Sequence, residues 1–275
     1  MPIKTDGQER RSIALEFELP GTPDQVWRAI ATGPGISSWF VPSEVEERQG
    51  GAVAFHLGPG LESTGEVTAF EPPRCFAYVE PGWSETAPPL GTEFVIEARA
   101  GGTCVVRLVH SLFTTQSDWD DELGSMETGW PPFFEVLKLY LTHFAGQPGT
   151  SIRPTGQHAG SDAEAWALLT GKLNLADAAL GQRRAAPAET APPLAGTVER
   201  ISEGGNHREL TLRLDQPAPG LAMVGAYSWG GITRAAVSLY FYGDDALAVA
   251  ARQEPVWDDW MAEHFKTPPA AGKTG

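Results

Sequence analysis

Long apolar runs are missing from this 275-residue sequence. No segment approaches the roughly 20 apolar residues that a membrane span requires. The N-terminal stretch PIKTDGQERR also lacks the apolar centre of a secretory signal peptide. We therefore expect a soluble, cytoplasmic protein that does not insert into membranes.

Cysteine is scarce, with only Cys75 and Cys104, each inside a predicted strand. Because no export signal is seen, we expect no disulfide and interpret both as buried thiols.

Positive charge is also short, since 20 Lys and Arg face 35 Asp and Glu, which gives a net charge of −15. Nucleic-acid binding needs clustered Lys and Arg to contact phosphates, so we expect no nucleic acid as a partner. The sequence also lacks a Gly-rich phosphate loop with lysine, HExxH, paired CxxC and GxSxG. We therefore predict no cofactor and no metal, and no catalytic motif can be demonstrated.

The most informative pattern lies in residues 11–40. Apolar and polar residues alternate over residues 13–19, which predicts a strand with one buried face. Thr22 can cap a helix that starts at Pro23, and apolar residues follow at helical spacing up to Ile30. Residues 33–35, Gly-Pro-Gly, are expected to break this helix before one more short turn.

The segment that follows is predicted to be mostly strands, with a long helix at its end. Two hairpin-like pairs, a loop at 82–91 and a long hairpin across Gly101 and Gly102 precede the helix. Apolar residues recur every three or four positions over 126–144, with Pro131 and Pro132 expected in the first turn. The predicted strands are residues 41–47, 52–57, 63–70, 74–79, 91–100 and 103–113.

This order of pieces resembles the START-like or SRPBCC superfamily, in particular the branch similar to activators of the heat-shock protein 90 ATPase. The resemblance covers residues 11–145. It implies an α+β helix-grip fold, in which a curved antiparallel sheet wraps a long C-terminal helix and leaves a cavity. In this superfamily the cavity serves lipid transport, hormone binding, aromatic polyketide cyclisation and protein contact, so the fold alone assigns no function. The pieces that carry the resemblance are ELPGTPDQVWRAI, GISSWF, the paired glycines Gly50 and Gly51, TGEVTAFEPPRCFAYV, GGTCVVRLVHSLF, and GW at Gly129 and Trp130.

The rest of the chain predicts a second domain. Residues 1–145 form the START-like domain, and residues 146–160, rich in Gly, Pro, Ser and Thr, are expected to be a linker. Residues 161–275 then repeat the order of helix, sheet and long helix, without an initial strand like ALEFEL. We predict a degenerate grip-like α+β domain, and a cap on the first domain is the alternative. Its elements are a helix at 163–173 capped by Ser161, strands at 196–201, 208–214, 221–229 and 235–242, and a helix at 244–265.

His110 is the polar residue that draws attention. In TCVVRLVHSLF an outward Arg107 places Cys104, Leu108 and His110 on the face toward the helix. A histidine there could exchange a proton near neutral pH. It could instead be structural, bonded to a carbonyl at the strand end. The structural role is favoured, and the catalytic residues stay unassigned with His110 as the one candidate.

Aromatic residues give the ligand-site prediction. Most of them are expected to fill the core. Those at loops and helix ends are expected near the cavity mouth, where they would suit a flat or lipid-like apolar ligand. The predicted ligand-binding residues are Tyr78, Trp83, His110, Trp130 and Phe134.

Two acidic groups are interpreted as surface. Glu44, Glu46 and Glu47 are expected on a solvated face. Residues 117–122, SDWDDE, lack the glycine and the bidentate glutamate of a calcium loop, and are expected to form a flexible acidic rim.

Three functions remain open. The first is a binding protein for a hydrophobic small molecule, and the second is an aromatic cyclase-like, polyketide-tailoring enzyme that uses the same cavity. The third, suggested by the family name, is a chaperone ATPase regulator, but no chaperone-binding segment is seen in the sequence. A protein partner or a homodimer also stays open, and a regulator or stress-response role in a bacterial cell would fit any of the three.

Overall fold

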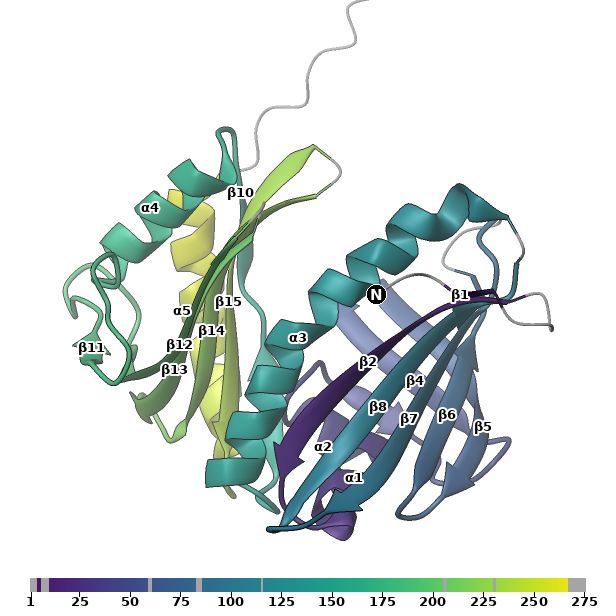
Figure 1. Ribbon diagram of the computed structural model, residues 1–275. Coiled ribbons are helices and arrows are strands. Elements are labelled where there is room, and N and C mark those ends of the chain that lie inside the picture. The colour runs from purple at the N-terminus through teal and green to yellow at the C-terminus, as the bar shows by residue number, and fades with distance from the viewer. Residues whose placement is uncertain are drawn as a thin grey trace, which may run out of the picture. The chain divides into compact units, whose positions relative to one another are not determined.

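The computed structural model describes residues 4–5, 10–58, 61–82, 86–114, 116–204, 207–229 and 231–266. The chain divides into two compact units, Met1–Gly149 and Thr150–Gly275, here called unit 1 and unit 2. Each unit combines an antiparallel sheet with helices, which is the predicted α+β class (Figure 1). None of the helices in these described ranges is both long and apolar enough to cross a membrane.

In the described part of unit 1, eight strands form one antiparallel sheet in the order β1-β2-β8-β7-β6-β5-β4-β3. Strands β3 to β8 follow one another as a meander, and β2 pairs with the last strand, β8. Each predicted strand of the first domain is found. The bounds are β1 Lys4–Thr5, β2 Arg11–Pro20, β3 Ser43–Val45, β4 Ala52–Gly58, β5 Leu61–Glu71, β6 Cys75–Glu80, β7 Leu90–Arg99 and β8 Thr103–Leu112.

Two short helices follow β2. Helix α1 (Pro23–Ala31) starts at the predicted cap: Thr22 Oγ1 accepts from the backbone N–H of Gln25 at 3.3 Å, and the Gln25 side chain accepts from the Thr22 N–H at 2.9 Å. The break falls at Thr32, whose backbone is extended. The Gly-Pro-Gly triplet, predicted to be only a breaker, instead begins α2 (Gly33–Ser37), because the Thr32 hydroxyl caps this second helix.

Helix α3 (Asp120–His143) is longer than predicted. It begins six residues before position 126, directly after the 3₁₀ turn η1 (Ser117–Trp119). Acidic residues in a first turn favour a helix start, and the apolar spacing of the sequence does not record this signal. Pro131 and Pro132 therefore lie inside the helix rather than in its first turn, and each removes one bond to the carbonyl four residues earlier.

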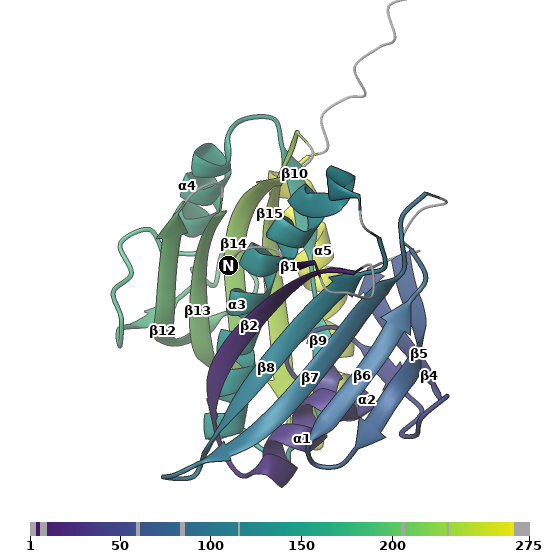
Figure 2. The same ribbon diagram turned by 45° about the vertical axis from the view of Figure 1, so that its right-hand side comes forward.

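The inward face of unit 1 follows the predicted alternation. On β8, Leu108 and His110 are buried while Arg107 is exposed. Figure 1 and Figure 2 show α3 running beside β2. The Phe17 ring of β2 stacks on the Phe134 ring of α3 with 3.7 Å between centroids, so an aromatic contact joins the helix to the sheet.

In unit 2, the described strands form one seven-stranded sheet in the order β10-β15-β14-β13-β12-β11, and β9 also pairs with β15. The predicted strands and both predicted helices of this half are present. The bounds are β9 Gly149–Ile152, β10 Thr155–His158, α4 Asp162–Lys172, β11 Arg183–Ala185, β12 Ala195–Gly204, β13 His207–Gln216, β14 Gly220–Trp229, β15 Ile232–Tyr242 and α5 Ala246–His264.

The prediction of a linker at 146–160 was wrong, because this segment contains β9 and β10. Both strands are only four residues long and carry no apolar alternation. They form through pairing with β15, for example Thr155 opposite Ala236. A short strand, β10, therefore precedes α4, but it has neither the length nor the apolar alternation of the ALEFEL strand. Strand β10 pairs with the last strand of its sheet, as β2 does in unit 1.

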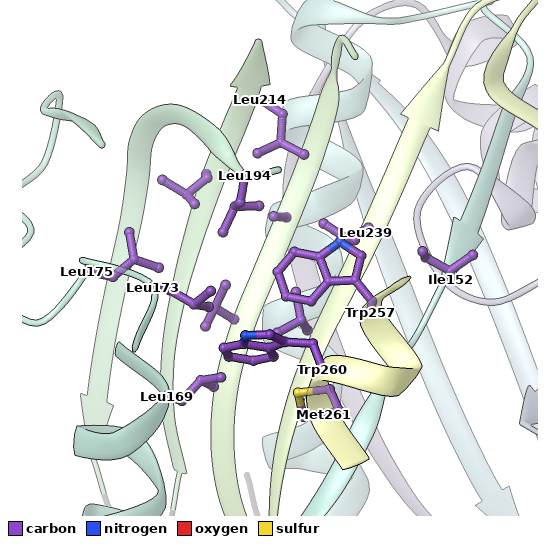
Figure 3. Close-up of a cluster of buried hydrophobic side chains, with 14 of the residues drawn as sticks. Ile152, Leu169, Leu173, Leu175, Leu194, Leu214, Leu239, Trp257, Trp260 and Met261 are labelled. Carbon is purple, nitrogen blue, oxygen red and sulfur yellow. The ribbon is translucent and has the colours of Figure 1, made fainter. Parts of the chain in front are cut away.

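The core of unit 2 lies between its sheet and the helices α4 and α5 (Figure 3). Trp257 of α5 is fully buried, and Trp260 donates its indole N–H to the Thr190 carbonyl at 2.9 Å. The predicted cap of α4 is present, with Ser161 accepting from the Glu164 N–H at 3.2 Å. The burial of these apolar side chains stabilises unit 2 chiefly through the hydrophobic effect.

Candidate functional site

A row of three polar side chains crosses the inward face of the unit 1 sheet. Strand register places Tyr78 of β6 opposite Thr92 of β7, and Thr92 opposite His110 of β8. Their exposed fractions are 5, 1 and 2%. Since i and i+2 share a face, the next row along these strands is Phe76, Phe94 and Leu108, which is wholly apolar.

Two of the three polar groups are hydrogen-bonded to each other. Thr92 Oγ1 lies 3.1 Å from His110 Nδ1, and Tyr78 lies opposite Thr92 on the neighbouring strand. Burial lowers the pKa of His110 to about 3, so its imidazole is neutral at physiological pH. Burial, together with the nearby Glu80 carboxylate, raises the pKa of Tyr78 well above its ordinary value.

His110 has one ring nitrogen with nothing to bind. Its Nε2 is buried and has no hydrogen-bond partner among the residues that the structure describes. The expected bond from a structural histidine to a carbonyl is not observed, because Nδ1 is paired with the Thr92 hydroxyl instead. An unpaired polar atom in an apolar interior is uncommon and calls for a ligand or a solvent molecule.

Aromatic rings from α3 and from the segment after α2 cover this row. The Trp130 ring stacks on the His110 ring with 5.4 Å between centroids and 24° between planes. The Phe40 ring stacks on the Trp130 ring with 5.0 Å between centroids. The Phe94 ring meets the Trp130 ring edge-on, with 6.4 Å between centroids. Trp130 itself is only half-buried, so this side chain separates His110 from solvent.

The structure thus brings together three of the five predicted ligand-binding residues: Tyr78, His110 and Trp130. Phe134, one helical turn after Trp130, is 2% exposed, and its ring lies 6.1 Å from the Trp130 ring. Its stack on Phe17 makes it part of the core beside the site. Trp83 lies outside the described residues.

Sequence inspection missed two residues of this region, Thr92 and Glu80. Thr92 shares the inward alternation of Phe94 and Ile96, which was the available signal. Glu80 lies two residues after Tyr78 on the same face, where burial raises the pKa of its carboxyl while a hydrogen bond from the Ser63 hydroxyl opposes the shift. Glu80 is the last residue of β6, where a glutamate is usually exposed, so nothing in the sequence indicates that it lies near the site.

The acidic segment at 117–122 is helical and not the loop that was predicted, since residues 117–119 form η1 and Asp120 begins α3. Asp120 accepts two hydrogen bonds from the Arg11 guanidinium, from Nε at 2.6 Å and from Nη2 at 2.5 Å. This bidentate pair fixes the start of α3 to β2. Within the described ranges, no group of three or more His, Cys, Asp or Glu side chains is arranged to hold a metal ion. Glu44, Glu46 and Glu47 are exposed, as expected.

Both cysteines are free thiols, but only Cys104 is fully buried, whereas Cys75 is half-buried. Burial raises the pKa of both thiols. Neither belongs to the polar row.

A separate hollow of about 610 Å³ lies at the other end of α3. Tyr140 contributes to it, and ten helical residues place Tyr140 roughly 15 Å from Trp130 along the axis. None of the predicted ligand-binding residues lines this hollow. Its lining comes from Gln25, Arg28, Ala29, Thr32, Pro34, Gly35, Glu47, Tyr140, Ala145, Gly146, Gln147 and Pro148.

A sheet in which β2 pairs with the last strand, β8, and a long helix, α3, packs against it is the arrangement expected of the START-like class. Residues 20–142 match the sequence model of the family described as activator of Hsp90 ATPase homolog 1-like protein. This match covers most of unit 1 and agrees with the family that the resemblance implied. The match ends before unit 2 begins.

Several solved structures are similar to about half or to most of the chain. The protein MLL2253 from Mesorhizobium loti is 23% identical, over 49% of this chain and 98% of its own, with a TM-score of 0.45. DynU16, from the dynemicin biosynthetic locus, is 15% identical over 91% of this chain and 95% of its own, with a TM-score of 0.43. The di-domain ARO/CYC BexL, from the BE-7585A biosynthetic pathway, is 12% identical over 94% and 100%, with a TM-score of 0.43. No match was found among curated proteins.

Proposed function

We propose that unit 1 binds a small, largely apolar aromatic molecule between α3 and the sheet, beside His110. The observation that carries this proposal is the buried Nε2 of His110, which has no partner among the described residues. Leaving a buried polar atom unpaired costs about 1–3 kcal/mol. A ligand that reaches this atom recovers that free energy and stacks on the surrounding rings.

A ligand would enter the site by displacing the Trp130 side chain. The helix is locally weakened next to it, because Pro131 and Pro132 each remove a backbone hydrogen bond. The preceding residue, Gly129, has no side chain and gives the backbone there more conformational freedom. These features favour a local movement of Trp130 that leaves the rest of α3 in place.

Binding is favoured over acid–base catalysis at this histidine. A general base works best when its pKa lies near the working pH. With a pKa of about 3, the His110 imidazole is a weak base at neutral pH. An aromatic cyclase-like activity would then depend on another group, and turnover of an aromatic polyketide that survives His110→Ala is the result that would favour this alternative.

The chaperone-regulator alternative makes a separate demand on the chain. It requires that the purified full-length protein stimulate ATP hydrolysis by a purified heat-shock protein 90. Stimulation that persists when His110 is replaced would assign the activity to a protein-contact surface and not to the ligand site.

The test of binding uses the full chain and tetralin, a flat apolar probe. Tetralin binding should change the tryptophan fluorescence, and Trp130→Phe should reduce that change, because Trp130 covers the site while Trp39, whose ring lies 6.3 Å from the Trp130 ring, still reports on binding. The matched control is Trp257→Phe in the core of unit 2, which should retain the change. No binding by calorimetry, together with no apolar molecule in native mass spectra of protein from its own host, would refute the proposal. So would a fluorescence change that is undiminished in Trp130→Phe.

A further inference from the structure

The hydrogen-bond directions in the polar row limit what His110 offers a ligand. A threonine hydroxyl has one proton to donate, and a neutral imidazole carries one N–H. Within the row, a hydrogen bond joins Thr92 Oγ1 and His110 Nδ1. Two arrangements of protons are therefore possible along the row.

In the first arrangement the Thr92 hydroxyl donates to His110 Nδ1. The ring proton of His110 is then on Nε2, which becomes an unpaired donor. In the second arrangement Nδ1–H donates to Thr92 Oγ1. The Thr92 proton and the Nε2 lone pair are then both unpaired, because the hydrogen bonds of the described residues give neither group another partner.

The first arrangement leaves one buried group unpaired and the second leaves two. Each unpaired group costs free energy, so the first arrangement is the more stable one. The site thus presents an N–H donor, next to the Trp130 ring, to whatever enters it.

The charges near His110 further restrict the chemical class of the ligand. A neutral imidazole offers no positive charge to an anion. Glu80, on the same face two residues from Tyr78, would repel a carboxylate. An uncharged acceptor is the group that both features tolerate.

We propose that the ligand is an uncharged aromatic compound whose carbonyl oxygen accepts a hydrogen bond from His110 Nε2. This inference rests on the proposed function and specifies the chemistry of its ligand. The ring system of the compound occupies the aromatic surroundings, and the carbonyl supplies the partner that Nε2 lacks.

The test compares three probes of similar size on the full-length protein by calorimetry: 1-tetralone, tetralin and 1-naphthoate. One net hydrogen bond makes 1-tetralone bind about tenfold more tightly than tetralin. The anion 1-naphthoate should bind more weakly than 1-tetralone. In His110→Phe the preference for the ketone should disappear while tetralin still binds.

The control is His56→Gln, which replaces a histidine on the exposed side of β4 and should keep the preference for 1-tetralone. Equal affinity for 1-tetralone and tetralin, or a preference that survives His110→Phe, would overturn the inference and leave the proposed function standing. If none of the probes binds, the proposed function fails with it.

A second measurement does not depend on any variant folding. Long-range ¹H–¹⁵N correlation spectra of the wild-type protein at pH 7 distinguish a protonated from an unprotonated ring nitrogen. We expect His110 to carry its proton on Nε2, with Nδ1 unprotonated. The opposite pattern would overturn the inference.

Discussion

The buried imidazole of His110 predicts a specific loss of stability on acidification. Its pKa falls from the ordinary value of 6.5 to about 3 in the folded protein, because burial penalises the charged form. Between these two values the unfolded chain binds a proton that the folded chain does not. The contribution of His110 to stability is therefore fully present above pH 6.5 and is lost as the pH falls toward 3.

The size of the loss follows from the same two pKa values. Where the unfolded chain binds one proton more than the folded chain, the free energy of unfolding changes by about 1.4 kcal/mol per pH unit. Acidification from pH 7 to pH 5 ends about one and a half pH units below 6.5, the pKa of the histidine in the unfolded chain. Unit 1 should lose about 2 kcal/mol from this residue over that range.

The assay is urea unfolding of the full chain at pH 7 and pH 5, for the wild type and for His110→Gln. Glutamine does not titrate and still offers a hydrogen-bonding group near Thr92. The difference in unfolding free energy between the two proteins should shift by about 2 kcal/mol in disfavour of the wild type at pH 5. His56→Gln on β4 shows how much of any shift comes from losing a surface histidine.

Parallel stability curves for the wild type and His110→Gln would refute this reasoning. So would a histidine NMR signal that is absent from His110→Gln and that titrates in the folded wild type with a midpoint above pH 5. Either result would mean that the imidazole is far better solvated than its 2% exposure indicates.

Three further predictions concern stability and are measured by chemical unfolding of the full chain. Thr22→Ala removes the capping box with Gln25 and should cost about 1 kcal/mol, whereas Thr22→Ser should cost little. Gly196→Ala should cost about 1–3 kcal/mol, because the added Cβ would lie 2.3 Å from the carbonyl oxygen of residue 213. In Gly171→Ala, within α4, the added Cβ would meet nothing within 4 Å. This second substitution should stabilise the protein by about 0.5–1 kcal/mol. Trp257→Ala empties a fully buried position and should cost about 3–5 kcal/mol; a cost below 1 kcal/mol would contradict the packing in Figure 3.

Local signals predicted most elements of the fold, and the errors fall where distant segments decide. Alternation placed the buried and exposed faces of β8 correctly. The start of α3 was missed because the apolar spacing does not extend to its acidic first turn, where Arg11, 109 residues away in sequence, pairs with Asp120. Strands β9 and β10 were missed because only their pairing with β15 makes them strands.

The site was predicted in part for a related reason. Tyr78, His110 and Trp130 could be chosen from residue type and face, but their neighbour Thr92 depends on strand register. A two-residue turn at Gly101 and Gly102, as predicted, would place Thr92 opposite Ser111. The observed loop includes residue 100 and pairs Arg99 with Thr103, which places Thr92 opposite His110. One residue of loop length therefore decides whether the polar row exists.

The polar row is better explained by recognition than by stability. A face filled with valine and leucine would avoid an unpaired nitrogen and the cost of burying three polar groups. Within the row, Thr92 satisfies Nδ1 and so directs the imidazole proton to the other nitrogen, whose partner is missing. Removing Thr92 alone would leave the proton free to move to Nδ1, whereas removing His110 would remove the donor. The two residues thus have different parts in the same site: His110 supplies the contact, and Thr92 sets its direction.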